Sequence, residues 1–158
     1  QRVEPARSES PAVVPEAARS GEGGYVAEGA GDFAALIDAS PPDAQPQLRS
    51  MCDWAIALEE EGLIGNLATY HNKRSVTLIP ALPIDNAGIV TIWHSDTGGR
   101  LQFWRSVLER RAPATLPAVE EEAAPATVGQ GTVTYEITDE LLATLTDAYR
   151  EAVDNIRG

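Results

Sequence analysis

The residue types that could perform catalysis are few, and their spacing matches no known catalytic pattern. Cys52 is the single cysteine and lies at the edge of the apolar stripe of a predicted helix, while His71 and His94 end predicted strands. A cysteine nucleophile needs a nearby base and a lowered pKa. Two histidines with Asp85 or Asp96 could hold a metal, but no metal-binding spacing is present. We therefore expect no catalytic residue, no metal ligand and no cofactor, and we interpret the cysteine as a small buried side chain.

Motifs that bind phosphate or activate a serine are absent from the sequence. The glycine turns at 97–99 and 129–131 do not continue into a phosphate-binding loop, and no G-x-S-x-G element occurs. The carboxylate runs at 59–61 and 120–122 fall on predicted helices, which is typical of a solvated face. A hydrolase that uses an unrecognised carboxylate pair, or Cys52 with a histidine, stays open as a third hypothesis.

Positive charge gathers in the middle of an acidic chain. The 158 residues carry a formal net charge of −12, yet residues 66–112 hold six basic and three acidic side chains. A basic sheet edge beside exposed aromatic rings could bind nucleic acid through phosphates and stacking. The alternative is that these charges are solvated at turns or paired with carboxylates. The candidate binding residues are Lys73, Arg74, Arg100, Arg110 and Trp93.

The stretch 101–113 concentrates arginines beside a tryptophan. On a helical wheel the apolar side is defined by Trp104 and its neighbours in the next turn, so we expect Trp104 to be structural. Arg105 should be an exposed partner of the residue four positions later. Arg110 points away from the apolar side and is free to contact a partner. Arg111 points along the apolar side, so we predict a structural residue bonded to helix carbonyls or to a carboxylate among 120–122.

The elements that would position these residues form an antiparallel meander after a helix. Residues 46–61 show helical spacing of apolar positions and end at Gly62. Strand signals follow at 66–71, 75–82, 89–94 and 100–104. Because the connections are four or five residues long, neighbouring strands should be antiparallel.

Helical patterns dominate the rest of the chain. Residues 104–111 and 115–123 predict short helices, and Thr138 caps a long amphipathic helix whose apolar arc includes Leu145. We therefore predict an α+β fold: a two-layer domain with an N-terminal helix, a three- to four-stranded antiparallel meander and C-terminal helices. Leu145 should be part of the core.

The first part of the chain has a different composition. Residues 1–47 hold six of the eleven prolines and few large apolar side chains. We therefore expect a flexible acidic linker over residues 1–45, fully mobile over 1–31 with one short helical turn near residues 33–37, and a single domain over 46–158. Because the chain starts with Gln1, we expect a piece of a longer polypeptide.

These observations favour a noncatalytic interaction domain that is tethered by its linker to a larger protein or assembly. The expected partner is a protein or an adjoining domain, and the alternative is a nucleic acid bound by the basic sheet edge. No apolar run is long enough to span a membrane, so we expect no membrane association. The single cysteine is compatible with a reducing compartment, which favours a cytoplasmic location.

Overall fold

The computed structural model describes residues 24–158, which form an α+β fold around a six-stranded sheet. The strands follow one another in sequence order and every neighbouring pair is antiparallel, so the sheet is a simple meander. The strands are β1 (Tyr25–Glu28), β2 (Asn66–His71), β3 (Val76–Ala81), β4 (Val90–Trp93), β5 (Arg100–Trp104) and β6 (Gln130–Thr134).

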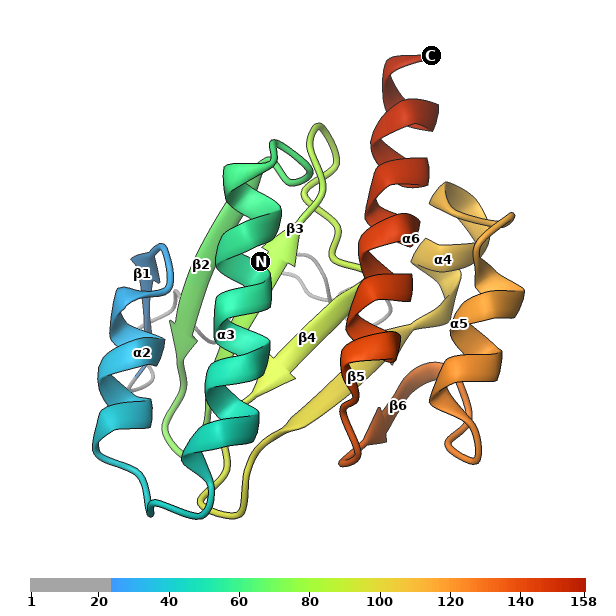
Figure 1. Cartoon of the computed structure of the whole chain (residues 1–158). Coiled ribbons are helices and arrows are strands. Elements are labelled where there is room, and N and C mark those ends of the chain that lie inside the picture. Colours follow the sequence, from blue (N-terminus) through green and yellow to red (C-terminus); the bar gives the residue numbers. More distant parts are fainter. Residues whose placement is uncertain (1–23) are drawn as a thin grey trace.

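The helices of residues 24–158 lie on one side of this sheet (Figure 1). Helix α3 runs in front of the first strands and α6 in front of the last ones, with α5 packed against α6. The α+β class and the antiparallel meander are therefore confirmed. The helices are α2 (Gly31–Asp38), α3 (Gln45–Glu60), α4 (Arg105–Arg111), α5 (Leu116–Ala123) and α6 (Asp139–Arg157).

The sheet is larger than the three to four strands that we expected. Both additional strands lie at its edges: β1 has four residues, and β6 contains Gly131 and a register irregularity against β5. Short or irregular edge strands give weak sequence signals, because a period-2 pattern needs several consecutive residues.

The folded part also begins earlier than the expected boundary at residue 46. Strand β1 and helix α2 precede that position, and Phe33 and Ile37 of α2 are fully buried. The part of the predicted linker that covers residues 24–45 is thus structured, because these two side chains complete the core over β2. Residues 1–23, where we also expected mobility, lie outside the described residues.

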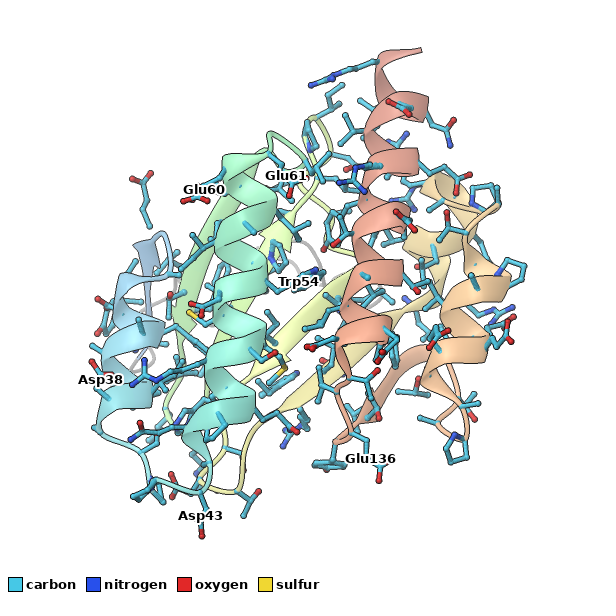
Figure 2. The ribbon with its side chains drawn as sticks, viewed as in Figure 1. Asp38, Asp43, Trp54, Glu60, Glu61 and Glu136 are labelled. Atoms are coloured by element: carbon cyan, nitrogen blue, oxygen red, sulfur yellow. The ribbon has the colours of Figure 1, made fainter. Side chains whose placement is uncertain are left out.

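The main core lies between the sheet and the helices. Alternation along the strands directs Leu67, Leu78 and Ile92 to the helical side, where all three are at most 2% exposed. Helix α6 adds Leu145, which is fully buried. Trp54 of α3 lies between α3 and α6 (Figure 2) and donates a hydrogen bond from Nε1 to Thr146 Oγ1 at 2.9 Å. This bond joins the two long helices.

The opposite face of the sheet, called here the far face, carries the alternate side chains. Ala68, Tyr70 and Ile79 form a small apolar cluster there, separate from the main core. Within residues 24–158, no helix is both long and apolar enough to cross a membrane.

Candidate interaction site at one end of the sheet

Two hairpins meet at one end of the sheet and bring four of the predicted binding residues into one region. The β2–β3 turn carries Lys73 and Arg74, and it closes with a hydrogen bond from Asn72 N to Ser75 O of 2.8 Å. The start of β3 pairs with the end of β4, so this turn lies beside the β4–β5 connection. Trp93 ends β4 and Arg100 begins β5, directly opposite each other in the ladder. We call Lys73, Arg74, Trp93 and Arg100 the basic corner.

The aromatic member of the basic corner is held in a fixed position. The guanidinium of Arg100 lies over the Trp93 ring, 4.7 Å from its centroid, which is the geometry of a cation–π contact. The indole Nε1 of Trp93 donates to Gln102 Oε1 at 2.7 Å, and Gln102 Nε2 donates to Gly131 O at 3.0 Å. The ring is therefore clamped between a cation and an amide that is itself anchored to β6.

The cations of the basic corner differ from most other arginines in this fold. Arg49, Arg105 and Arg150 each form an ion pair with a carboxylate. Across residues 24–158, by contrast, no carboxylate pairs with Lys73, Arg74 or Arg100, and the first two side chains are exposed. Within the described residues, these three charges are therefore not neutralised by a neighbouring carboxylate.

The remaining predicted binding residue, Arg110, lies at the opposite end of the sheet. It belongs to α4, and its Nη2 is 3.4 Å from Oδ2 of Asp85 in the β3–β4 connection. Arg110 is half-exposed but is not part of the basic corner.

Arg111 also binds Asp85, through Nε at 3.2 Å and Nη2 at 2.7 Å. Arg111 thus pairs with a carboxylate, but with Asp85 and not with one of residues 120–122 as expected, and Glu120 binds Arg105 at 2.6 Å. Asp85 lies in the connection between β3 and β4. The helical spacing around Arg111 does not predict that this connection lies beside α4.

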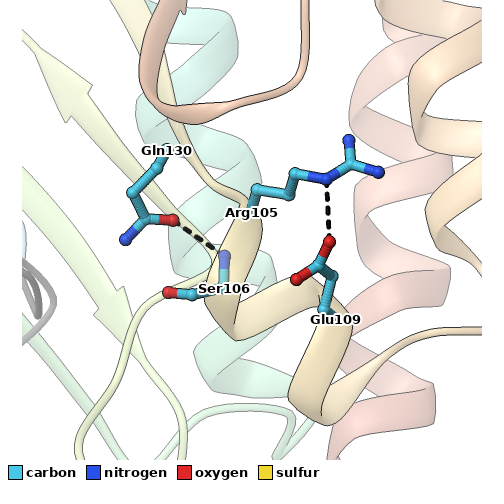
Figure 3. Close-up of a pocket in the computed structure, with 4 residues that line it drawn as sticks. All are labelled: Arg105, Ser106, Glu109 and Gln130. Atoms are coloured by element: carbon cyan, nitrogen blue, oxygen red, sulfur yellow. Dashed lines mark hydrogen bonds and ion pairs between the residues drawn. The ribbon is translucent and has the colours of Figure 1, made fainter.

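A pocket lies beside the first turn of α4 (Figure 3), with a volume of about 320 Å³ and a lining of Arg105, Ser106, Glu109 and Gln130. Its polar groups already have partners. Arg105 Nε donates to Glu109 Oε2 at 2.9 Å, and Ser106 N donates to Gln130 Oε1 at 2.8 Å. The charge of Arg105 in the pocket wall is therefore already neutralised by Glu109 and Glu120, so the pocket is better suited to water than to a charged ligand.

The two histidines hold α2 against the sheet. His71 Nε2 lies 3.0 Å from Asp32 Oδ2 at the start of this helix, and His94 Nε2 lies 2.7 Å from Ser40 Oγ just after its end. Burial lowers the pKa of His94, and the charge of Asp96 opposes this effect. The two histidines thus contact opposite ends of α2, His71 at its start and His94 just after its end.

The Ser40–His94 contact has the spacing of a nucleophile and its base, but its surroundings are structural. Ser40 Oγ is also 2.7 Å from Leu36 O, so its single proton satisfies a carbonyl at the end of the helix. Ser40 is only 8% exposed. Nothing in this arrangement activates the hydroxyl for attack on a substrate.

Cys52 is buried in α3, and burial raises the pKa of its thiol to about 11, with a further contribution from the charge of Asp53. Such a thiol is protonated near neutral pH and is a poor nucleophile. Within residues 24–158, no group of three or more histidine, cysteine, aspartate or glutamate side chains could hold a metal ion.

The sequence reasoning missed Gln102, which orients Trp93. The signal is visible in retrospect: alternation within residues 100–104 places Gln102 on the same side of β5 as Arg100. The carboxylate run at 59–61 was expected on a solvated face, and Glu60 is exposed at the end of α3, as are Asp43 and Glu136 in the loops (Figure 2). The basic corner therefore belongs to the strands and the acidic surface to the helices and loops.

Comparison with known proteins finds no matching family model, no matching curated protein and no matching solved structure.

Proposed function

We propose that this domain is a noncatalytic interaction module that binds an acidic segment of a protein partner at the basic corner. The observation that carries this proposal is the set of three cations without a carboxylate partner within residues 24–158, gathered around a fixed tryptophan in a chain of net charge −12. Local positive charge on an acidic protein favours a partner that presents its charge in a short, defined segment.

A nucleic acid is the second candidate, and two features favour it less. Arg100 already covers one face of the Trp93 ring, which removes a surface on which a base could stack. Three cations also neutralise few phosphates, whereas the net charge repels a long polyanion. A short peptide with two or three carboxylates matches the number of available cations.

The experiment uses two anionic probes of equal charge, an octaglutamate peptide and an oligothymidylate, titrated into the ¹⁵N-labelled chain at low salt. We expect the peptide to shift the amide signals of residues 73–75 and the indole N–H signal of Trp93. The double variant Lys73→Glu/Arg74→Glu should abolish these shifts. The control, Arg150→Glu/Arg157→Glu, makes the same change in charge on exposed positions of α6 and should preserve them.

Two results would contradict the proposal. Tighter binding of the oligothymidylate, with the steep salt dependence of phosphate contacts, would support the nucleic-acid alternative. An absence of shifts at the basic corner with both probes at low salt would mean that this region does not bind anionic partners.

A further inference from the structure

Tyr135 is an exposed aromatic side chain at the same end of the sheet as the basic corner. It directly follows β6, whose last residue, Thr134, pairs with Leu101 of β5, so the register brings Tyr135 beside Arg100. The residue is 59% exposed, and within residues 24–158 no hydrogen bond or ring contact involves its side chain. Tyrosine and arginine are both enriched at protein–protein interfaces. Their proximity here extends the basic corner toward β6.

Helix α3 holds the backbone of Tyr135 against the β4–β5 connection. The amide Nε2 of Gln47 donates to Tyr135 O at 3.0 Å and to Gly98 O at 3.0 Å. One side chain thus joins the segment after β6 to the turn that leads into Arg100, at the lower end of the sheet in Figure 1. Because both backbone segments are bonded to the same amide, Tyr135 has a fixed position relative to the basic corner. A surface that is already ordered loses less entropy when a partner binds.

The charge along this end of the sheet changes sign between the β2–β3 turn and β6. Lys73 and Arg74 are exposed in that turn, whereas Asp96 and Glu136 are exposed in the β4–β5 connection and just after β6. Figure 2 shows Glu136 near the start of α6. A partner carboxylate is attracted by the first pair and repelled by the second. The acidic part of a bound segment should therefore end before the segment reaches Tyr135.

We propose that the acidic segment bound at the basic corner carries an aromatic residue that packs on Tyr135. This inference rests on the proposed function and adds the sequence pattern of the partner. Strands are about 4.8 Å apart, so β3 and β6 are separated by roughly 14 Å, which an extended chain covers in about four residues. The pattern is therefore a short run of carboxylates with an aromatic side chain about four residues after the first of them.

Tyr25 is the other exposed tyrosine within residues 24–158, and it is less suited to this contact. It lies on β1 at the opposite edge of the sheet, and the residue is 55% exposed. Its ring stacks on His71 with the centroids 4.1 Å apart and the planes inclined by 11°, so one face is already covered. Tyr25 thus provides a matched control, a tyrosine of similar exposure at the other edge.

The test uses two blocked peptides of equal charge, acetyl-Glu-Glu-Glu-Gly-Phe-amide and acetyl-Glu-Glu-Glu-Gly-Ala-amide, titrated into the ¹⁵N-labelled chain at low salt. Both should shift the amide signals of residues 73–75, and only the phenylalanine peptide should also shift those of Tyr135 and Glu136. We expect the phenylalanine peptide to bind roughly 2- to 10-fold more tightly, the usual gain from one aromatic pair. Tyr135→Ala should remove this difference between the peptides, whereas Tyr25→Ala should keep it.

The outcomes separate the aromatic contact from the proposed function. Equal affinities of the two peptides, with shifts at residues 73–75, would overturn the aromatic contact and leave the basic corner as a site for acidic peptides. A difference that persists in Tyr135→Ala, or that disappears in Tyr25→Ala, would assign the aromatic residue to another surface and would also overturn it. An absence of shifts at residues 73–75 with both peptides would refute the proposed function together with this inference.

Discussion

The hydroxyl of Tyr149 bonds to the carbonyl of Pro80 at the place where the pairing of two central strands is interrupted. Tyr149 Oη donates to Pro80 O at 2.8 Å and accepts a hydrogen bond from Ile89 N at 3.2 Å. Strands β3 and β4 pair directly at Thr77–Trp93 and Leu78–Ile92, and the two segments meet again at a bridge between Ala81 and Gly88, so the ladder is interrupted around Pro80 and Ile89. The tyrosine of α6 replaces the missing ladder bonds and explains how a proline is accommodated in an interior strand.

Removal of this hydroxyl should therefore destabilise the protein although the aromatic ring stays. Tyr149 is fully buried, and Tyr149→Phe leaves a carbonyl and an amide without a partner, which we expect to cost about 1–3 kcal/mol of unfolding free energy. Urea denaturation measures the change. Tyr135→Phe is the control, because that side chain is exposed and should change stability by less than about 0.5 kcal/mol. Equal stability of Tyr149→Phe and the unmodified chain would contradict the bridging role.

The interrupted pairing of β3 and β4 is one of the features that local sequence patterns do not predict. Helical periodicity correctly predicted α3 and α6, and short apolar or β-branched runs between turn residues correctly predicted the four strands β2 to β5. These patterns missed the edge strands β1 and β6, because β1 has only four residues and β6 pairs irregularly with β5. The partner of Arg111 was likewise set by the β3–β4 connection. Long-range contacts of this kind are decided by how strands diverge, and local spacing does not encode them.

The candidate site could be predicted in part for the same reason. Residues 73, 74, 93 and 100 were selected from charge and exposed aromatic character, and the meander brings them together because adjacent hairpins share one end of the sheet. Arg110 shares the same composition signal but lies on α4, beyond the end of β5, and thus at the other end. The strand order of a meander determines which turns lie next to each other. The position of a helix that follows the sheet depends on how that helix packs, which the strand order does not determine.

Truncation of Leu145 should cost far more than truncation of its neighbour. Leu145 is fully buried in the middle of α6 against the sheet, so Leu145→Ala creates a cavity and should lower the unfolding free energy by about 2–5 kcal/mol. Thr144→Ala, which removes an exposed hydroxyl bonded within the helix, is the matched control and should have little effect. Thermal or urea denaturation followed by circular dichroism distinguishes them. A loss below about 0.5 kcal/mol for Leu145→Ala would instead assign this face of α6 to a partner.

Cys52 should react slowly with thiol reagents in the native protein. Burial, followed by the negative charge of Asp53, raises its pKa to about 11, so at neutral pH almost no thiolate is present. We expect iodoacetamide to modify this residue only after addition of denaturant. Mass spectrometry follows the reaction, and free cysteine at the same pH is the reference. Native-state modification faster than that of the reference would revive the hypothesis of a cysteine-dependent hydrolase.

Acidification should weaken the attachment of α2 through His94. Burial lowers the pKa of this histidine in the folded state, so the unfolded chain binds its proton more readily. The corresponding stability is fully present above about pH 6.5 and is lost as the pH falls toward the lowered folded pKa. Urea melts at about pH 7.5 and about pH 5 should differ less for His94→Gln than for the unmodified chain. Ser40→Ala should keep the pH dependence, because burial rather than the serine causes the shift; an unchanged slope in His94→Gln would refute this explanation.

Arg111 and Arg110 bind the same carboxylate but should contribute unequally. Burial alone would raise the pKa of Asp85, yet hydrogen bonds from Arg111 and from the Ala87 amide, with the charges of both arginines, lower it overall. Arg111 makes the two shorter contacts and is 25% exposed in its side chain, whereas Arg110 makes one contact at 3.4 Å and is 50% exposed. At neutral pH we therefore expect Arg111→Ala to cost about 1 kcal/mol of unfolding free energy and Arg110→Ala much less.

Because the folded pKa of Asp85 is lowered, this stabilisation is present above the unfolded value of about 4 and disappears as the pH falls through the folded value. Urea melts of both variants at neutral pH and in the acidic range measure the difference. Equal losses in the two variants, or a loss in Arg111→Ala that persists after Asp85 is protonated, would show that the arginine stabilises the protein through its backbone or its methylene groups instead.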